Sequence, residues 1–137
     1  MTGIMLHHVS VTTRDLDRAA HFYETVLRLS RIPRPPFAIP GIWFGVGDRQ
    51  IHVTVYPEAN FRDARPVDTN DVHFALRVAD FEEWRAHLGR MGYGEGLPDG
   101  DPRRLIVKLR GPAGFPQIYL MDPDRNVIEL NGPPWSG

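Results

Sequence analysis

The sequence predicts an α+β fold built from two tandem βαβββ modules, each running strand, helix and then about three strands. Two observations predict this fold: a repeat between the two halves of the 137-residue chain, and a helix start signal after the first strand of each half. A chain of this length lies in the usual range for one domain. We therefore expect a single domain over residues 1–137, with module 1 at about 4–57, a linker at 58–70 and module 2 at about 71–131.

The repeat relates two eight-residue segments at an offset of 65. His8-Val-Ser-Val-Thr-Thr-Arg-Asp15 aligns with His73-Phe-Ala-Leu-Arg-Val-Ala-Asp80, since 73 − 8 = 80 − 15 = 65. In both segments apolar residues alternate with the others, which is typical of a strand that packs one face on a core. His8 and His73 therefore each lie on the strand face away from the apolar row.

An aspartate follows each of these strands, at the position where a helix N-cap is expected. After Asp15, apolar residues recur at helical spacing from Leu16 to Leu27, and after Asp80 they recur from Phe81 to Met91. Both patterns predict an amphipathic helix with one face on the sheet.

Short strand-like runs separated by turn residues follow each helix. The first half contains 42–46 and 51–56, and the second half contains 105–109, 117–121 and 127–130. Four prolines lie in the segment 31–41, which we expect to be an extended surface loop. The segment 94–104 is expected to be a further loop.

Composition narrows the possible function classes. Sixteen Lys and Arg residues against seventeen Asp and Glu give a formal net charge of −1, so no broad positive field favours nucleic acid or anionic lipid. With no secretion signal and no apolar run near the roughly 20 residues that span a bilayer, we expect a cytoplasmic protein without a membrane partner. The absence of cysteine leaves only nitrogen and oxygen ligands for any metal.

Four side chains that could bind a metal occupy matching strand positions. His52 faces away from the apolar row of its strand, and Glu129 does the same in the last strand of module 2. Together with His8 and His73 they supply three imidazoles and a carboxylate, which suits Zn, Ni, Fe, Mn or Co. If the two sheets are curved mixed sheets that face one another, the four residues line a metal-binding cavity. Such an ion would keep open positions, which favours catalysis over a structural role.

Further residues are candidates for substrate contacts. Arg77 shares the strand face of His73 and could neutralise an anionic group. Phe37, Trp43 and Tyr56 could line a pocket, although aromatic residues in strands commonly belong to the core. The remaining histidines, expected to face solvent or to cap helices, are His7, His21 and His87.

Three motifs carry a family resemblance. They are Leu6-His-His-Val-Ser-Val11, Asp71-Val-His-Phe-Ala-Leu76 and Leu120-Met-Asp-Pro-Asp-Arg-Asn-Val-Ile-Glu-Leu130. The chain resembles the vicinal oxygen chelate (VOC) superfamily, which includes glyoxalase I, extradiol dioxygenases and fosfomycin or bleomycin resistance proteins. The resemblance implies one divalent metal ion bound by His8, His52, His73 and Glu129, a small-molecule substrate, and a homodimer. Two positions depart from the pattern of glyoxalase I: His52 replaces a second glutamate, and Arg125 replaces a turn glycine.

The resemblance leaves three functions open. The first is a metal-dependent lyase or isomerase of the glyoxalase type, with Glu129 as ligand and base and His52 as ligand or proton carrier. The replacement of the second glutamate argues against a standard lactoylglutathione lyase. The second is an extradiol-type Fe(II) dioxygenase with His8, His73 and Glu129 as a facial triad. The third is a resistance protein that binds an antibiotic without turnover.

Overall fold

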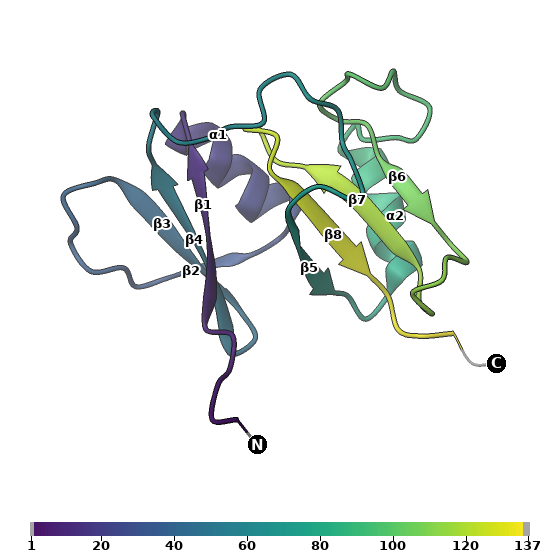
Figure 1. The fold of residues 1–137 in the computed structure, drawn as a ribbon, viewed down its shortest axis with the longest axis horizontal. Coiled ribbons are helices and arrows are strands. Elements are labelled where there is room, and N and C mark those ends of the chain that lie inside the picture. The colour runs from purple at the N-terminus through teal and green to yellow at the C-terminus, as the bar shows by residue number, and fades with distance from the viewer. Residues whose placement is uncertain (1, 136–137) are drawn as a thin grey trace. The chain divides into compact units, whose positions relative to one another are not determined.

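The computed structural model describes residues 2–135, and the chain divides into two compact units, Met1–Asn60 and Phe61–Gly137. Each unit contains one four-stranded mixed sheet and one helical segment (Figure 1). The predicted fold class is confirmed, because the element order strand, helix and three strands occurs twice. Among the described residues, no helix is both long enough and apolar enough to cross a membrane.

The first unit contains six elements. They are β1 (His8–Thr13), α1 (Leu16–His21), the π-helix η1 (Phe22–Val26), β2 (Ser30–Ile32), β3 (Gly41–Val46) and β4 (Arg49–Val55). The sheet order is β1-β4-β3-β2, with β1 parallel to β4 and the other pairs antiparallel. Asp15 caps α1 as predicted, since its carboxylate accepts from the backbone N–H of Arg18 at 3.1 Å. The expected loop at 31–41 is shorter than predicted, because Ser30–Ile32 pairs as an edge strand.

The second unit repeats this arrangement. Its elements are β5 (His73–Arg77), α2 (Phe81–Arg90), β6 (Ile106–Lys108), β7 (Gln117–Met121) and β8 (Val127–Asn131). The sheet order is β5-β8-β7-β6, with β5 parallel to β8. Asp80 caps α2 by accepting from the backbone N–H of Glu83 at 3.1 Å. The long segment 91–105 separates α2 from β6, whereas only residues 27–29 occupy the same place in the first unit.

The parallel strand pairs of the two units have equivalent registers. The residues that face each other across these pairs include Ser10 with His52, and Ala75 with Glu129. His8 lies two residues before Ser10, and His73 lies two residues before Ala75. Because side chains two apart share a face of a strand, His8 and His52 are diagonal neighbours, and so are His73 and Glu129. The repeat seen in the sequence is thus also a repeat of side-chain placement.

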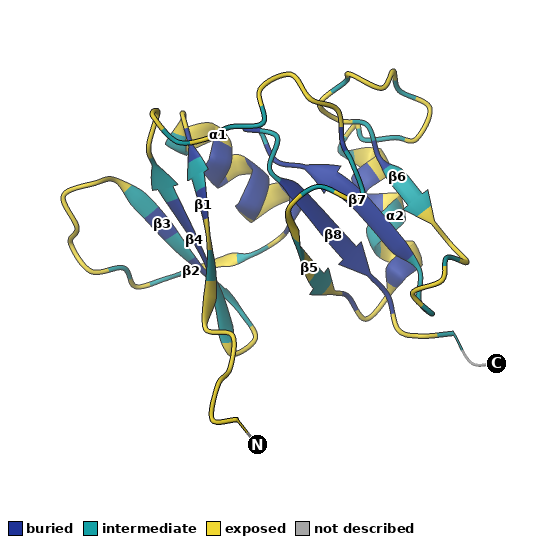
Figure 2. Ribbon diagram, viewed as in Figure 1, coloured by how far each residue is buried: buried dark blue, intermediate teal, exposed yellow. Residues whose placement is uncertain are grey.

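Each unit buries one face of its sheet, and β7 and β8 are buried along their whole length (Figure 2). In the first unit α1 packs on β4, and the Tyr23 ring stacks on Phe44 with centroids 5.6 Å apart. Tyr119, Met121 and Val127 are buried on the Glu129 face of the second sheet. On the opposite faces, the other buried apolar strand residues are Val11, Ile42, Ile51 and Val53 in the first unit, and Ile118, Leu120, Ile128 and Leu130 in the second. These residues alternate with the candidate metal ligands, so the ligands lie on the opposite face of each sheet.

Candidate metal centre and adjoining pocket

In the first unit, the imidazole of His52 is stacked between two other rings. Its centroid lies 4.0 Å from that of His8 and 3.9 Å from that of Trp43, with interplanar angles of 18° and 4°. The His52 Nε2–H donates to Gln50 Oε1 at 2.8 Å, which leaves the lone pair on Nδ1. The structure therefore brings the rings of His8 and His52 into contact.

His52 is a neutral imidazole near pH 7. Burial, together with electrostatic repulsion from His8, His7 and Arg34, lowers its pKa from 6.5 to about 4. A neutral imidazole is the form that binds a metal ion. The environment of His52 therefore suits a ligand, and it also disfavours a role as a proton donor.

In the second unit, His73 and Glu129 form a contact. His73 Nε2 lies 3.3 Å from Glu129 Oε1, and His73 Nδ1 lies 2.7 Å from the backbone oxygen of Asp71. Because a carbonyl oxygen can only accept, Nδ1 carries the hydrogen and Nε2 faces the carboxylate. Nε2 lies within hydrogen-bonding distance of Oε1, and a bound metal ion would take the place of the shared hydrogen. This carbonyl contact is the outer-shell support that metal-binding histidines commonly have.

A network of donors holds the other oxygen of Glu129. Oε2 accepts from Asn131 Nδ2 at 2.8 Å and from Gln117 Nε2 at 3.2 Å. Burial would raise the pKa of Glu129, but hydrogen bonds from Asn131, Gln117, Tyr119 and His73 outweigh it and hold the pKa below its ordinary value. Burial and the neighbouring carboxylate raise the pKa of Tyr119, so its hydroxyl remains a donor. Glu129 is therefore ionised and fixed in position near pH 7.

The donor set fits a divalent metal ion in its chemistry. His52 is neutral, His73 presents Nε2, and Glu129 carries the negative charge. The stacking of His8 on His52 is not a binding orientation, because ligand lone pairs lie in the ring planes, so one ring must turn about its Cα–Cβ bond. Among the residues that the structure describes, no group of three or more His, Cys, Asp or Glu side chains is gathered closely enough to hold a metal ion. Each unit supplies one pair of candidate ligands.

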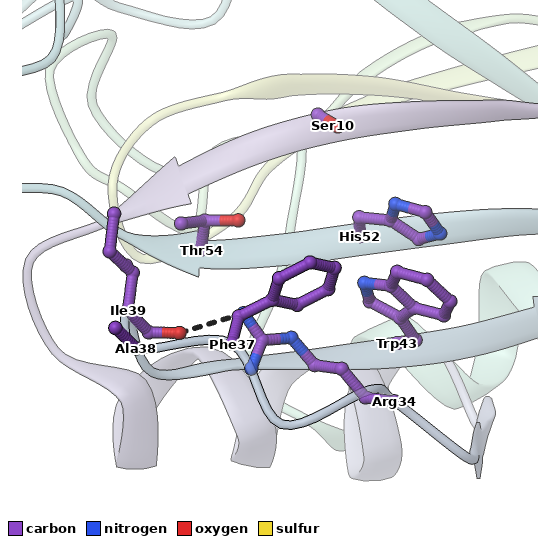
Figure 3. A pocket seen from close by; sticks show the side chains of 8 residues that line it. All are labelled: Ser10, Arg34, Phe37, Ala38, Ile39, Trp43, His52 and Thr54. Carbon is purple, nitrogen blue, oxygen red and sulfur yellow. Dashed lines mark hydrogen bonds between the residues drawn. The ribbon is translucent and has the colours of Figure 1, made fainter.

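A pocket of about 430 Å³ lies on the His52 face of the first sheet, under the segment 33–40 (Figure 3). Its lining residues are Ser10, Arg34, Phe37, Ala38, Ile39, Trp43, His52 and Thr54. The Phe37 and Trp43 rings lie 6.0 Å apart, and Arg34 Nη2 donates to the backbone oxygen of Ile39 at 2.8 Å. The proline-rich loop expected from the sequence therefore forms one wall of a pocket beside a candidate ligand.

The other candidate residues are found in varied environments. Arg77 donates from Nε to Asn131 Oδ1, and its guanidinium lies 4.8 Å from the centre of the Phe115 ring. Tyr56 is 46% exposed and is outside the pocket lining. The expectation that the His87 side chain faces solvent is wrong: it lies in the last turn of α2 but is buried, edge-on to Trp84.

Sequence reasoning did not identify three residues that shape the site. Alternation places Gln117 and Asn131 on the same strand face as Glu129, which was an available signal. The alternation did not indicate that the side-chain amides of both residues would donate to the carboxylate of Glu129. For Arg34 no such signal existed, because the path of a proline-rich loop does not follow from periodicity.

The chain belongs to the Glyoxalase/Bleomycin resistance protein/Dioxygenase superfamily, whose model matches residues 5–130. This confirms the resemblance stated above. A curated relative, glyoxylase I 4 from Arabidopsis thaliana, is 28% identical over 130 residues, which cover 91% of this chain and 68% of that protein.

Solved structures show the same fold. A glyoxalase family protein from Bacillus anthracis has a TM-score of 0.74 and 24% identity, over 96% of this chain and 98% of that one. A lactoylglutathione lyase from Agrobacterium tumefaciens has a TM-score of 0.64 and 20% identity, over 96% of both chains. At these identities the likeness establishes the two-module architecture and leaves the reaction to be argued from the side chains.

Proposed function

We propose that this protein is a metal-dependent lyase or isomerase of the glyoxalase type, acting on a small substrate that binds the metal through two adjacent oxygens. The observation that carries the proposal is the pair of equivalent ligand positions, His8 with His52 and His73 with Glu129. One divalent ion held by three neutral imidazoles and one carboxylate keeps a local charge of +1. An octahedral ion would retain two positions for substrate oxygens, which it would polarise.

The surroundings of Glu129 and His52 support distinct roles for them. A carboxylate held by several donors is a good ligand and a weak base, so metal binding is the first role of Glu129 and proton abstraction the second. His52 is neutral at working pH and can therefore be a ligand, whereas its lowered pKa makes it a weak proton acceptor. With one carboxylate in the set, the proposed reaction needs one base rather than two, unlike a standard lactoylglutathione lyase.

The comparisons support this class of reaction. The Arabidopsis relative is described as a glyoxylase I, and one solved neighbour is described as a lactoylglutathione lyase. Both descriptions agree with a metal-dependent lyase or isomerase in this superfamily.

The test is the metal content of the protein and its Glu129→Gln variant. We expect about one equivalent of metal per chain in the parent, and metal affinity at least about 100-fold weaker in the variant, because the only anionic ligand is lost. Glu95→Gln is the matched control, since Glu95 is exposed and pairs with Arg85 away from the site. Unchanged metal binding and turnover in Glu129→Gln would refute the proposal.

A second candidate, an extradiol-type Fe(II) dioxygenase, is favoured by one observation. The stacking of His52 and its hydrogen bond to Gln50 could keep it from the metal, which would leave His8, His73 and Glu129 as a facial triad. Anaerobic loading with Fe(II), followed by oxygen uptake with a panel of catechols, tests this. Uptake would establish the dioxygenase, and its absence across the panel would count against it.

We also propose that the protein is a homodimer, as its family resemblance implies. Four large apolar side chains near the first strands of the units are strongly exposed: Ile4, Met5, Leu6 and Val72. Exposed apolar groups of this kind commonly mark a protein interface. Sedimentation velocity should show a dimer at micromolar concentration, and a single monomeric species would contradict the proposal.

A further inference from the structure

We propose that the pocket of the first unit binds an aromatic carboxylate, with Arg34 pairing with the carboxylate and the aromatic ring lying against Phe37 and Trp43. This inference rests on the proposed function, because it names the class of substrate that the same site would take.

Arg34 is a cation with unused hydrogen-bonding capacity. Its Nη2 donates to the backbone oxygen of Ile39, but its Nε is buried and has no partner. No carboxylate among the described residues pairs with Arg34, whereas Arg31 nearby pairs with Glu24 at 2.8 Å. A buried donor without a partner points to a missing acceptor, and an arginine is well suited to bind a carboxylate.

The guanidinium of Arg34 is also held in place before any ligand arrives. It lies 4.9 Å from the centre of the Phe37 ring, and it passes so close to Gly41 that a Cβ there would lie 2.9 Å from Nη2. Figure 3 shows the Arg34 side chain beside Phe37, with its hydrogen bond to Ile39. A charged group fixed in this way loses little conformational freedom on binding.

The apolar walls of the pocket are open to solvent. Phe37 is 55% exposed and Ile39 is 46% exposed, although both line the pocket. The tilted rings of Phe37 and Trp43 offer flat surfaces that an aromatic ligand would cover. The volume of about 430 Å³ falls in the range of small-molecule sites and suits a compact, one-ring ligand.

The polar groups of the pocket complete the argument. Ser10, His52 and Thr54 lie on the sheet side, while Arg34 comes from the covering loop. A ligand with one anionic group and additional oxygens can therefore contact the loop cation and the His52 side of the pocket together. An uncharged or cationic molecule could not form an ion pair with Arg34.

The experiment is calorimetric titration of the full chain, treated with chelator, with phenylacetate, phenylacetamide and cyclohexylacetate. We expect phenylacetate to bind roughly tenfold or more tightly than phenylacetamide, since only the anion can pair with Arg34. Cyclohexylacetate should bind more weakly than phenylacetate, because it cannot stack on the rings. Equal affinity for phenylacetate and phenylacetamide, or no binding of phenylacetate at millimolar concentration, would overturn the proposal.

Variants of the pocket residues test whether phenylacetate binds in this pocket. Arg34→Met should weaken phenylacetate binding by roughly tenfold or more, and Arg34→Lys should restore part of it. Arg31→Met is the control, because it removes the same charge outside the pocket lining and should bind like the parent. Phe37→Leu changes a side chain that is largely exposed, so it should fold normally and still bind phenylacetate more weakly. Parent-like binding in both Arg34→Met and Phe37→Leu would overturn the assignment.

The same titration separates this inference from the proposed function. Glu129 is not among the residues that line the pocket, so the metal-free Glu129→Gln variant should bind phenylacetate as the parent does. If the parent protein binds no metal ion but still binds phenylacetate, the proposed function is wrong and the aromatic carboxylate site stands. If the parent binds metal but not phenylacetate, the pocket inference alone is wrong.

Discussion

The two modules present the same strand positions in different chemical surroundings. In the first, His52 is stacked between the rings of His8 and Trp43 and is kept neutral by burial and nearby cations. In the second, Glu129 is held by hydrogen-bond donors that keep it ionised. The comparison shows how one repeated register can place an uncharged imidazole on one sheet and a charged, fixed carboxylate on the other.

The rows of residues that surround His52 and Glu129 explain the difference. The row across the first sheet is Ile32, Trp43, His52 and Ser10, and the row across the second is Ile106, Tyr119, Glu129 and Ala75. In the next row, Gly41 faces Thr54 in the first sheet, where Gln117 faces Asn131 in the second. The small residues leave space for Arg34 and the pocket, while the amides occupy that space and anchor Glu129.

The largest predicted effect comes from making the second module resemble the first at one position. Asn131→Thr installs the residue found at the position of Thr54, and it removes the donor to Glu129 Oε2 and the acceptor of Arg77. We expect a loss of about 2 kcal/mol in the free energy of unfolding, measured by urea titration of metal-free protein. Asn60→Thr, at an exposed position, is the control. Equal stability of the two variants would mean that the amide network contributes little.

A smaller effect should appear in the pH dependence of stability. Above pH 6.5 His52 is neutral in both folded and unfolded protein; between about pH 6.5 and 4 the unfolded chain binds a proton that the folded chain does not. Stability should therefore fall as pH falls through this window, by about 1–2 kcal/mol from this residue. His52→Phe keeps an aromatic ring and removes the titration, so its unfolding free energy, measured without metal, should vary less with pH. Parallel profiles for variant and parent would disprove this account.

The smallest effects concern the two hairpin turns. Gly47 in the first module has φ 57° and Arg125 in the second has φ 66°, a region that favours glycine. Arg125 donates to the backbone oxygens of Arg65 and Gly100, at 3.1 Å each. Gly47→Ala should lower the free energy of unfolding by about 1 kcal/mol. Arg125→Gly should change the free energy of unfolding by less, because the relief of backbone strain offsets the two lost hydrogen bonds. Thermal unfolding measures both, and strong stabilisation by Arg125→Gly would show that the two hydrogen bonds contribute little.

Local patterns were sufficient to predict the fold class and the strand faces on which the four candidate ligands lie. The alternation around His8 and His73 and the N-cap aspartates depend on neighbouring residues, so they are readable without a structure. The equivalent registers then follow from the repeat. The burial of His87 was not predicted, because a histidine on an amphipathic helix carries no signal that distinguishes a packed ring from a solvated one.

The pocket and the donors to Glu129 depend on information that periodicity does not contain. Prolines indicate that 33–40 is irregular, but they do not indicate that it covers the His52 face or where Arg34 points. The rotamers of Gln117 and Asn131 are selected by the buried carboxylate between them. Both features arise from packing between distant parts of a module, which a local pattern cannot describe.

The unequal lengths of the modules have a consequence for how freely this architecture can change. Pairing Ser10 with His52 closes a loop of 42 residues, since 52 − 10 = 42, and pairing Ala75 with Glu129 closes one of 54, since 129 − 75 = 54. By polymer statistics this difference costs only about 0.2 kcal/mol of chain entropy. The segment 91–105 can therefore lengthen or shorten over evolutionary time almost without cost to the pairing that holds His73 beside Glu129.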